Sequence, residues 1–180
     1  MKKSKSDSST EKRFNISSKN TGLVLLSCYI PLLFDRLELT KDGQFLSSQA
    51  KLDATHFLHF LVTGFANKEE TIMPLNNLLC GIDLADKIPL EINIVDADKE
   101  MMERLIEAAL VSWTKLGQIS INGFREAWLV RDGALTELED KWTLKVEERG
   151  YDILIDYIPF SFSIINYPWM AKPLHVIWRN

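Results

Sequence analysis

Two apolar stretches lie close together between Thr55 and Gly81, and each repeats with the period of a helix. Apolar residues recur at steps of three and four, as one buried helix face requires. They are Leu58, Leu61, Val62 and Phe65 in the first stretch, and Leu75, Leu78 and Leu79 in the second. Gly81 stands where a left-handed residue ends a helix. The pattern predicts two core helices around which the rest of the chain packs.

The composition is that of a folded protein with an acidic body. The chain has 180 residues, 46% of them apolar, and five tryptophans, which is enough for one domain with a sizeable core. Residues 1–21 carry a net charge of +4 and the remainder −8. The acidic body argues against a nucleic-acid partner, which selects clustered Lys and Arg.

The first 21 residues are rich in Lys and Ser and poor in apolar side chains. We therefore expect residues 1–21 to be a disordered basic leader and residues 22–180 to form a single globular domain. Removing residues 1–20 is then expected to change the thermal midpoint by less than about 5 °C.

Helical periodicity and breaker residues predict five to six helices. Pro31 is expected to restart the first of them, with Leu32, Leu33, Phe34 and Leu37 facing the core. Ser47 or Ser48 is the expected N-cap of the second, and Asn67–Glu70 has the spacing of a capping box. The predicted ranges are Gly22–Leu39, Ser48–Phe65, Pro74–Cys80, Asp98–Leu116, Ser120–Val130 and Tyr151–Ile158.

The period then changes to two, which indicates strands. Ala134–Glu139 and Trp142–Glu147 flank Asp140-Lys141 and form a predicted hairpin, with Trp142, Leu144 and Val146 on one face. Leu174–Trp178 alternates likewise and is the predicted third strand. The fold class is therefore α+β: mainly helical, with a small antiparallel sheet made by the hairpin and the C-terminal strand.

No constellation of residues indicates catalysis, a cofactor or a metal. His56 and His59 share a helix face, but their spacing is three and no third ligand accompanies them. Asp152 and Asp156 lie at i and i+4, and we interpret them as a solvated helix face rather than an acid–base pair. We expect no enzymatic activity, no catalytic residue, no metal site and no cofactor.

Both cysteines, Cys28 and Cys80, are expected to be reduced core residues, because a disulfide framework needs more of them. The apolar run over residues 22–34 is too short to span a bilayer, so no membrane insertion is expected. The part of it before Cys28 is about six residues, shorter than the apolar region of a signal sequence. Synthesis in a reducing cytoplasm is the expected localisation.

Pro168, Trp169 and Met170 are the candidate partner contact. They lie before Pro173 in a stretch with little regular periodicity, and Trp and Met are favoured at protein interfaces. The alternative is that Trp169 fills the core against the hairpin.

Several blocks, in this order and spacing, resemble the conserved C-terminal region of contractile injection system tape measure proteins. The resemblance runs from Gly22 to Trp178. It rests on residues 22–26, 31–37, 56–64, 75–81, 123–126 and 131–133, and on Trp142, Tyr151-Asp152, Pro168-Trp169-Met170 and Pro173-Leu174. It implies a component of a phage-tail-like particle that sets tube length and contacts tube, baseplate or other particle proteins.

The chain departs from the family in length, because a ruler needs a long extended segment. About 20 residues of helix span only about 30 Å. We therefore expect either a truncated piece or a short relative with an assembly role, incorporated into the particle. A stand-alone binding module, such as a chaperone or cargo adaptor, is the alternative function.

Overall fold

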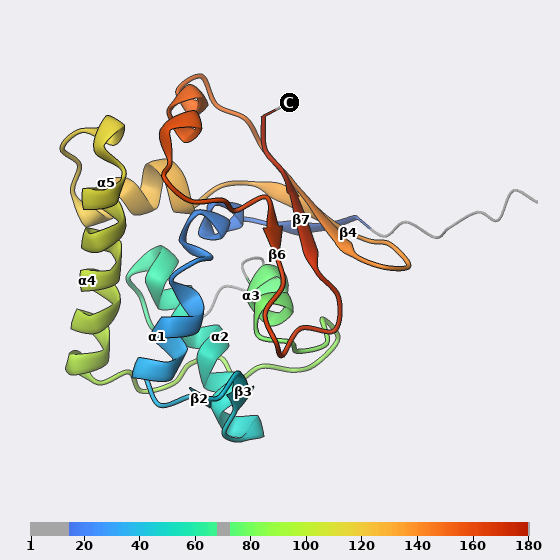
Figure 1. Ribbon diagram of the computed structural model, residues 1–180. Coiled ribbons are helices and arrows are strands. Elements are labelled where there is room, and N and C mark those ends of the chain that lie inside the picture. The colour runs from blue at the N-terminus through green and yellow to red at the C-terminus, as the bar shows by residue number, and fades with distance from the viewer. Residues whose placement is uncertain (1–14, 68–72, 180) are drawn as a thin grey trace, which may run out of the picture.

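Helices gather on one side of a twisted sheet in the computed structural model of the protein, which describes residues 15–67 and 73–179 (Figure 1). The α-helices are α1 (Ile30–Arg36), α2 (Ser48–Thr63), α3 (Met73–Leu79), α4 (Asp96–Ser112) and α5 (Ile121–Phe124). Short 3-10 helices are η1 (Thr21–Leu26), η2 (Thr114–Leu116) and η4 (Asp152–Tyr157), and η3 (Arg125–Leu129) is a π-helical turn. The strands are β1 (Asn15–Ser18), β2 (Thr40–Lys41), β3 (Gln44–Phe45), β4 (Gly133–Glu137), β5 (Trp142–Val146), β6 (Ile164–Ile165) and β7 (Leu174–Ile177). The predicted α+β class is confirmed.

The main sheet has five strands in the order β1-β4-β5-β7-β6. The predicted hairpin and C-terminal strand form its centre, and Leu144 and Val146 are buried as expected. However, the sheet is mixed and larger than the small antiparallel sheet we expected. β7 runs parallel to β5 because residues 147–173 form a crossover, which includes η4 and β6 and returns the chain to the same end of the sheet. The hairpin turn is centred one residue earlier than predicted, since the Leu138 amide donates to the Lys141 carbonyl at 2.8 Å.

Residues 15–21, which we assigned to the leader, belong to the fold. Strand β1 pairs with β4, and a buried chain of polar groups holds the segment: Ser18 donates to Asn20, and Asn20 donates to Asn76 at 2.7 Å. These buried side chains are polar and are satisfied by hydrogen bonds, so the hydropathy of the sequence did not indicate that the segment is part of the core. A cut that removes residues 1–20 also removes β1, so we now expect it to lower the thermal midpoint. Residues 1–14 lie outside the described residues.

The first apolar run divides as its proline predicts. Pro31 lies in the first turn of α1, and η1 precedes it as a separate turn. Leu33 and Phe34 are buried, but Leu32 is 53% exposed, contrary to expectation. Position 32 falls on the face of α1 that points away from the core, towards α4.

Helix α2 begins at its predicted cap and ends two residues early. The Ser47 hydroxyl accepts from the Ala50 amide at 3.0 Å, and the left-handed residue Gly64 ends the helix. Phe65 therefore leaves the predicted stripe and is 71% exposed. The buried Arg125 guanidinium donates to the Leu61 carbonyl at 3.1 Å, which stabilises a helix end that carries partial negative charge.

The remaining helices follow the sequence with shifts at their ends. Helix α3 ends before Gly81, whose φ of 67° confirms the predicted stop, whereas the Asn67–Glu70 capping box falls largely outside the described residues. The Ser120 hydroxyl caps α5 as predicted. Helix α4 ends four residues before Leu116, because Trp113 leaves helical geometry to enter the core and donate to the Leu154 carbonyl at 2.9 Å.

Asp152 is buried, so its interpretation as part of a solvated face is wrong. Both its carboxylate oxygens accept from Arg131 at 2.7 Å, and Trp178 donates to one of them at 2.8 Å. The Arg131 guanidinium in turn lies against the rings of Trp128, Tyr151 and Trp178, at 5.0–5.6 Å from their centroids. Asp156, one turn further on, is exposed as expected.

Gly22 is required where η1 crosses η3. A Cβ atom added there would lie 1.7 Å from the backbone oxygen of Trp128. We expect Gly22→Ala to destabilise the protein by about 2–3 kcal/mol, as overpacking does, and to lower the thermal midpoint in a melting experiment. Gly150→Ala is the control, because no atom lies within 4 Å of a Cβ placed there. Equal midpoints for the two variants would contradict the close approach.

Candidate protein-interaction site

The loop that carries Trp169 is fixed to the end of α3. The Trp169 indole donates to the carbonyl of Leu79, a helix-end group without an intrahelical partner, at 2.8 Å. The Trp169 backbone oxygen also approaches Gly81, where an added Cβ would lie 2.3 Å from it. The Trp169 ring packs against Phe34, Phe45 and Tyr167 with centroid distances of 5.1–5.8 Å. Trp169 is therefore half-buried, with its ring and hydrogen-bond contacts on α1, α3, β3 and Tyr167.

The three predicted contact residues have different environments. Pro168 is exposed, Trp169 is half-buried, and Met170 is buried. Below them, the Tyr167 hydroxyl donates to the Ser27 carbonyl at 2.6 Å. The loop thus presents Pro168 and the edge of Trp169 on a firmly held backbone, while Met170 packs inward.

A groove of about 640 Å³ runs beside this loop, and we call it the Trp169 groove. Four parts of the chain form it: β1, the end of α3 with the following loop, the β4–β5 hairpin, and residues 168–172. Its apolar walls include Ile16, Leu84 and Trp142. At its rim, Lys172 pairs with Glu137 at 2.8 Å. The groove offers apolar contact with charged edges, which is the anatomy of a protein-binding surface.

Sequence reasoning identified only the 168–170 part of this groove. The other walls come from segments as far apart as Ile16 and Trp142, and no local period joins them. The apolar residues Leu84 and Ala85 in the irregular stretch after Gly81 were the one available signal.

The histidines and cysteines that could bind a metal or act as a nucleophile do not form a reactive site among the described residues. His56 and His59 are buried in α2, and no group of three or more His, Cys, Asp or Glu side chains able to hold a metal occurs among the described residues. Cys80 is buried as expected, and burial raises the pKa of its thiol, which disfavours the thiolate. Cys28 is exposed rather than a core residue, because it lies between η1 and α1.

We predict that His56 and His59 are structural. Metal analysis of protein purified without added zinc should give far less than one equivalent, because structural zinc sites use four ligands. His56→Ala is the matching variant and should leave that low value unchanged. Stoichiometric zinc that disappears on this substitution would contradict the prediction.

No helix in the described part of the chain reaches the length and apolar character needed to cross a membrane.

The comparisons with known proteins point to one family. Neither the curated proteins nor the solved structures gave a match to this chain. The family model described as contractile injection system tape measure protein matches residues 1–178, nearly the whole chain. The resemblance seen in the sequence blocks is thereby confirmed: the chain belongs to the contractile injection system tape measure protein family.

Proposed function

We propose that this protein is a non-enzymatic assembly component of a phage-tail-like contractile particle. In this role it contacts a tube or baseplate protein and takes part in setting tube length. The observation that carries the proposal is the family match over residues 1–178. The buried positions of His56, Cys80 and Asp152 support a structural role, since each is packed in the core rather than open to a substrate.

The Trp169 groove is the proposed contact with the particle protein. Its loop is anchored by the Trp169–Leu79 hydrogen bond and its walls are apolar, so a partner meets a preorganised surface at little cost in ordering. Aromatic residues at the centre of such surfaces contribute much of the binding energy.

The test is co-purification of the tagged chain with the tube and baseplate proteins of its own particle. Ala85→Arg and Ala171→Arg place a long charged side chain in the groove at exposed positions, so the fold is kept. Each should reduce the co-purified particle protein at least tenfold, which corresponds to about 1.4 kcal/mol. Gln118→Arg, at an exposed position outside the groove, should have no effect.

Particle morphology separates the assembly role from its alternatives. Deleting the gene should abolish particles or change their tube length, as measured by electron microscopy. Normal particles of normal length, or failure to recover any tube or baseplate protein, would refute the proposal. Recovery of particle proteins before assembly but not from finished particles would indicate a chaperone or adaptor instead.

A further inference from the structure

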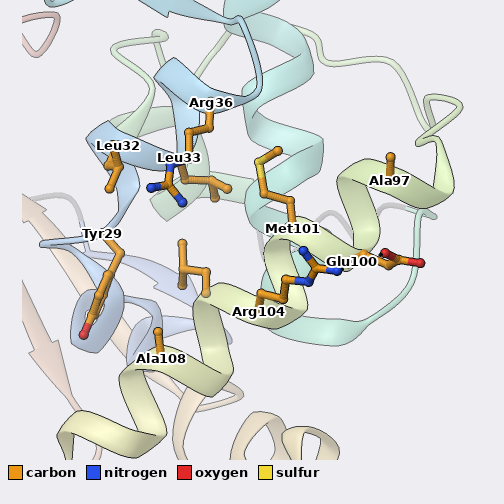
Figure 2. A pocket seen from close by; sticks show the side chains of 10 residues that line it. Tyr29, Leu32, Leu33, Arg36, Ala97, Glu100, Met101, Arg104 and Ala108 are labelled. Atoms are coloured by element: carbon orange, nitrogen blue, oxygen red, sulfur yellow. Dashed lines mark ion pairs between the residues drawn. The ribbon is translucent and has the colours of Figure 1, made fainter.

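A second groove, of about 550 Å³, lies between α1 and α4, away from the Trp169 groove (Figure 2). Tyr29, Leu32 and Arg36 line it from α1 and its N-cap, and Met101, Arg104 and Ala108 line it from α4. Leu32, more than half exposed, forms part of its wall. The groove is therefore an apolar trough between two helices, with one arginine on each side.

Helix α4 has two stripes of residues on different faces. One faces the core and contains Met102, Ile106 and Ala109. The other lines the groove at steps of 4, 3 and 4 residues, with Ala97, Met101, Arg104 and Ala108. The exposed Val111, three residues further on, continues this spacing beyond the groove. This second spacing is the seam of a coiled coil, and small residues such as Ala97 and Ala108 allow the backbone of another helix to approach. It spans about 21 Å, the length of four turns of helix.

The charges of the groove are opposite to those of the body. The chain as a whole carries −4, whereas the groove has two arginines and one glutamate. Arg104 pairs with Glu100 at 3.6 Å, and Arg36 makes no ion pair with any residue that the structure describes. An occupant with an acidic side chain at the centre of its apolar face would complete this arrangement.

We propose that the α1–α4 groove binds an amphipathic helix of another protein, whose apolar stripe carries a central acidic residue facing Arg36 and Arg104. The helix would lie nearly parallel to α4 and pack in coiled-coil fashion. This inference concerns a surface separate from the Trp169 groove and does not depend on the proposed particle contact.

A second copy of this chain fits the groove less well. Arg104 is the middle residue of the exposed stripe, so symmetric pairing of α4 with itself brings Arg104 against Arg104, in parallel or antiparallel register. Like charges facing each other at an interface disfavour that pairing.

The test uses the full chain and a dilute, labelled synthetic helix of about 21 residues, or three heptads, with leucine at the seam and one central glutamate. A matched peptide carries lysine in place of that glutamate. Fluorescence polarisation should show binding of the glutamate peptide, and binding of the lysine peptide should be about tenfold weaker. Ala108→Glu should abolish binding of both, because it puts a charge in the seam.

Reversing the charges of the two groove arginines tests whether they determine the preference between the peptides. The variant with Arg36→Glu and Arg104→Glu should reverse the preference and favour the lysine peptide. A control variant, with Lys19→Glu and Lys145→Glu, has the same change in net charge at exposed positions, one directly after β1 and one in β5, and should keep the original preference. Thermal melts check that every variant is folded.

Three results of the peptide experiment would overturn the inference. They are no saturable binding up to about 1 mM peptide, equal affinity of the natural chain for both peptides, and a preference unchanged in the Arg36→Glu, Arg104→Glu variant. Concentration-dependent dimerisation that Ala108→Glu abolishes would also overturn it, since the groove would then be a contact between copies. None of these outcomes involves tube or baseplate proteins, so failure here leaves the particle proposal standing.

Discussion

Replacing Asp152 by alanine is expected to lower the free energy of unfolding by about 3–5 kcal/mol, since it leaves the Arg131 guanidinium charged and buried without its partner. Arg131 is 0% exposed and Asp152 1% exposed. The substitution also removes the acceptor of the Trp178 indole. For a chain of this size, the loss corresponds to a fall of about 10 °C or more in the thermal midpoint, measured by calorimetry or circular dichroism.

Asp156→Ala is the matched control. It removes a carboxylate from the same short helix, but the Asp156 side chain is 60% exposed and its pairing with Arg179 is long, at 3.7 Å. Its cost should be below about 1 kcal/mol. The double variant Arg131→Met, Asp152→Leu should be more stable than Asp152→Ala, because no buried charge is left. A small effect of Asp152→Ala would show that water reaches Arg131.

Lowering the pH should weaken the ion pair between Arg131 and Asp152. Burial raises the pKa of the Asp152 carboxyl, but hydrogen bonds from Arg131, Trp178 and the Arg149 amide outweigh burial and hold that pKa below its ordinary value of 3.8. The contribution to stability is therefore complete above that value and is lost as the pH falls below it. The difference in midpoint between the natural chain and Asp152→Asn should shrink as the pH falls below about 4. A constant difference would contradict the lowered pKa.

Deleting residues 174–180 is expected to abolish the cooperative melt. The cut removes β7, which lies inside the sheet between β5 and β6, and exposes the buried face around Leu144. It also removes Trp178, and loss of one core tryptophan side chain alone costs about 3–5 kcal/mol. Seven residues are lost, yet their contribution rivals the whole stability of a typical domain. The shortened protein should aggregate or show an unfolded circular dichroism spectrum.

A stop after Trp178 separates the strand from the residues that follow it. It keeps β7 and the Trp178–Asp152 hydrogen bond and removes the long Arg179–Asp156 pair, so its midpoint should change by only about 2–4 °C. If the 174–180 deletion keeps its cooperative transition, β7 contributes little and the sheet is held by β1, β4 and β5.

The sequence predicted those elements whose stability is local. The Ser47 cap, the stop at Gly81 and the restart at Pro31 depend on residues a few positions apart, so their patterns could be read directly. Strand β1 and the parallel placement of β7 depend on partners far along the chain. Hydropathy alone carries no record of such pairing.

The residues that line the Trp169 groove were predicted in the same partial way. Pro168 and Trp169 were identified from their residue types and flanking prolines, and the structure adds that Leu79 anchors them. The polar burial of Arg131 and Asp152 was missed, because a charged side chain is assigned to the surface unless its partner is known, and the two lie 21 positions apart.

The contact between the first and last thirds of the chain can form only late in synthesis. The Thr21 hydroxyl donates to the Arg131 carbonyl, 110 positions later, and the apolar run Leu23–Leu26 is buried beneath that joint. A ribosome that adds 5–20 residues per second needs about 5–20 s to supply the missing partner. During that interval the emerging chain has an apolar segment whose native partners in η3 and β5 have not yet been made. Its yield in the cell should therefore depend on chaperones that bind nascent chains and on the speed of translation between these two segments.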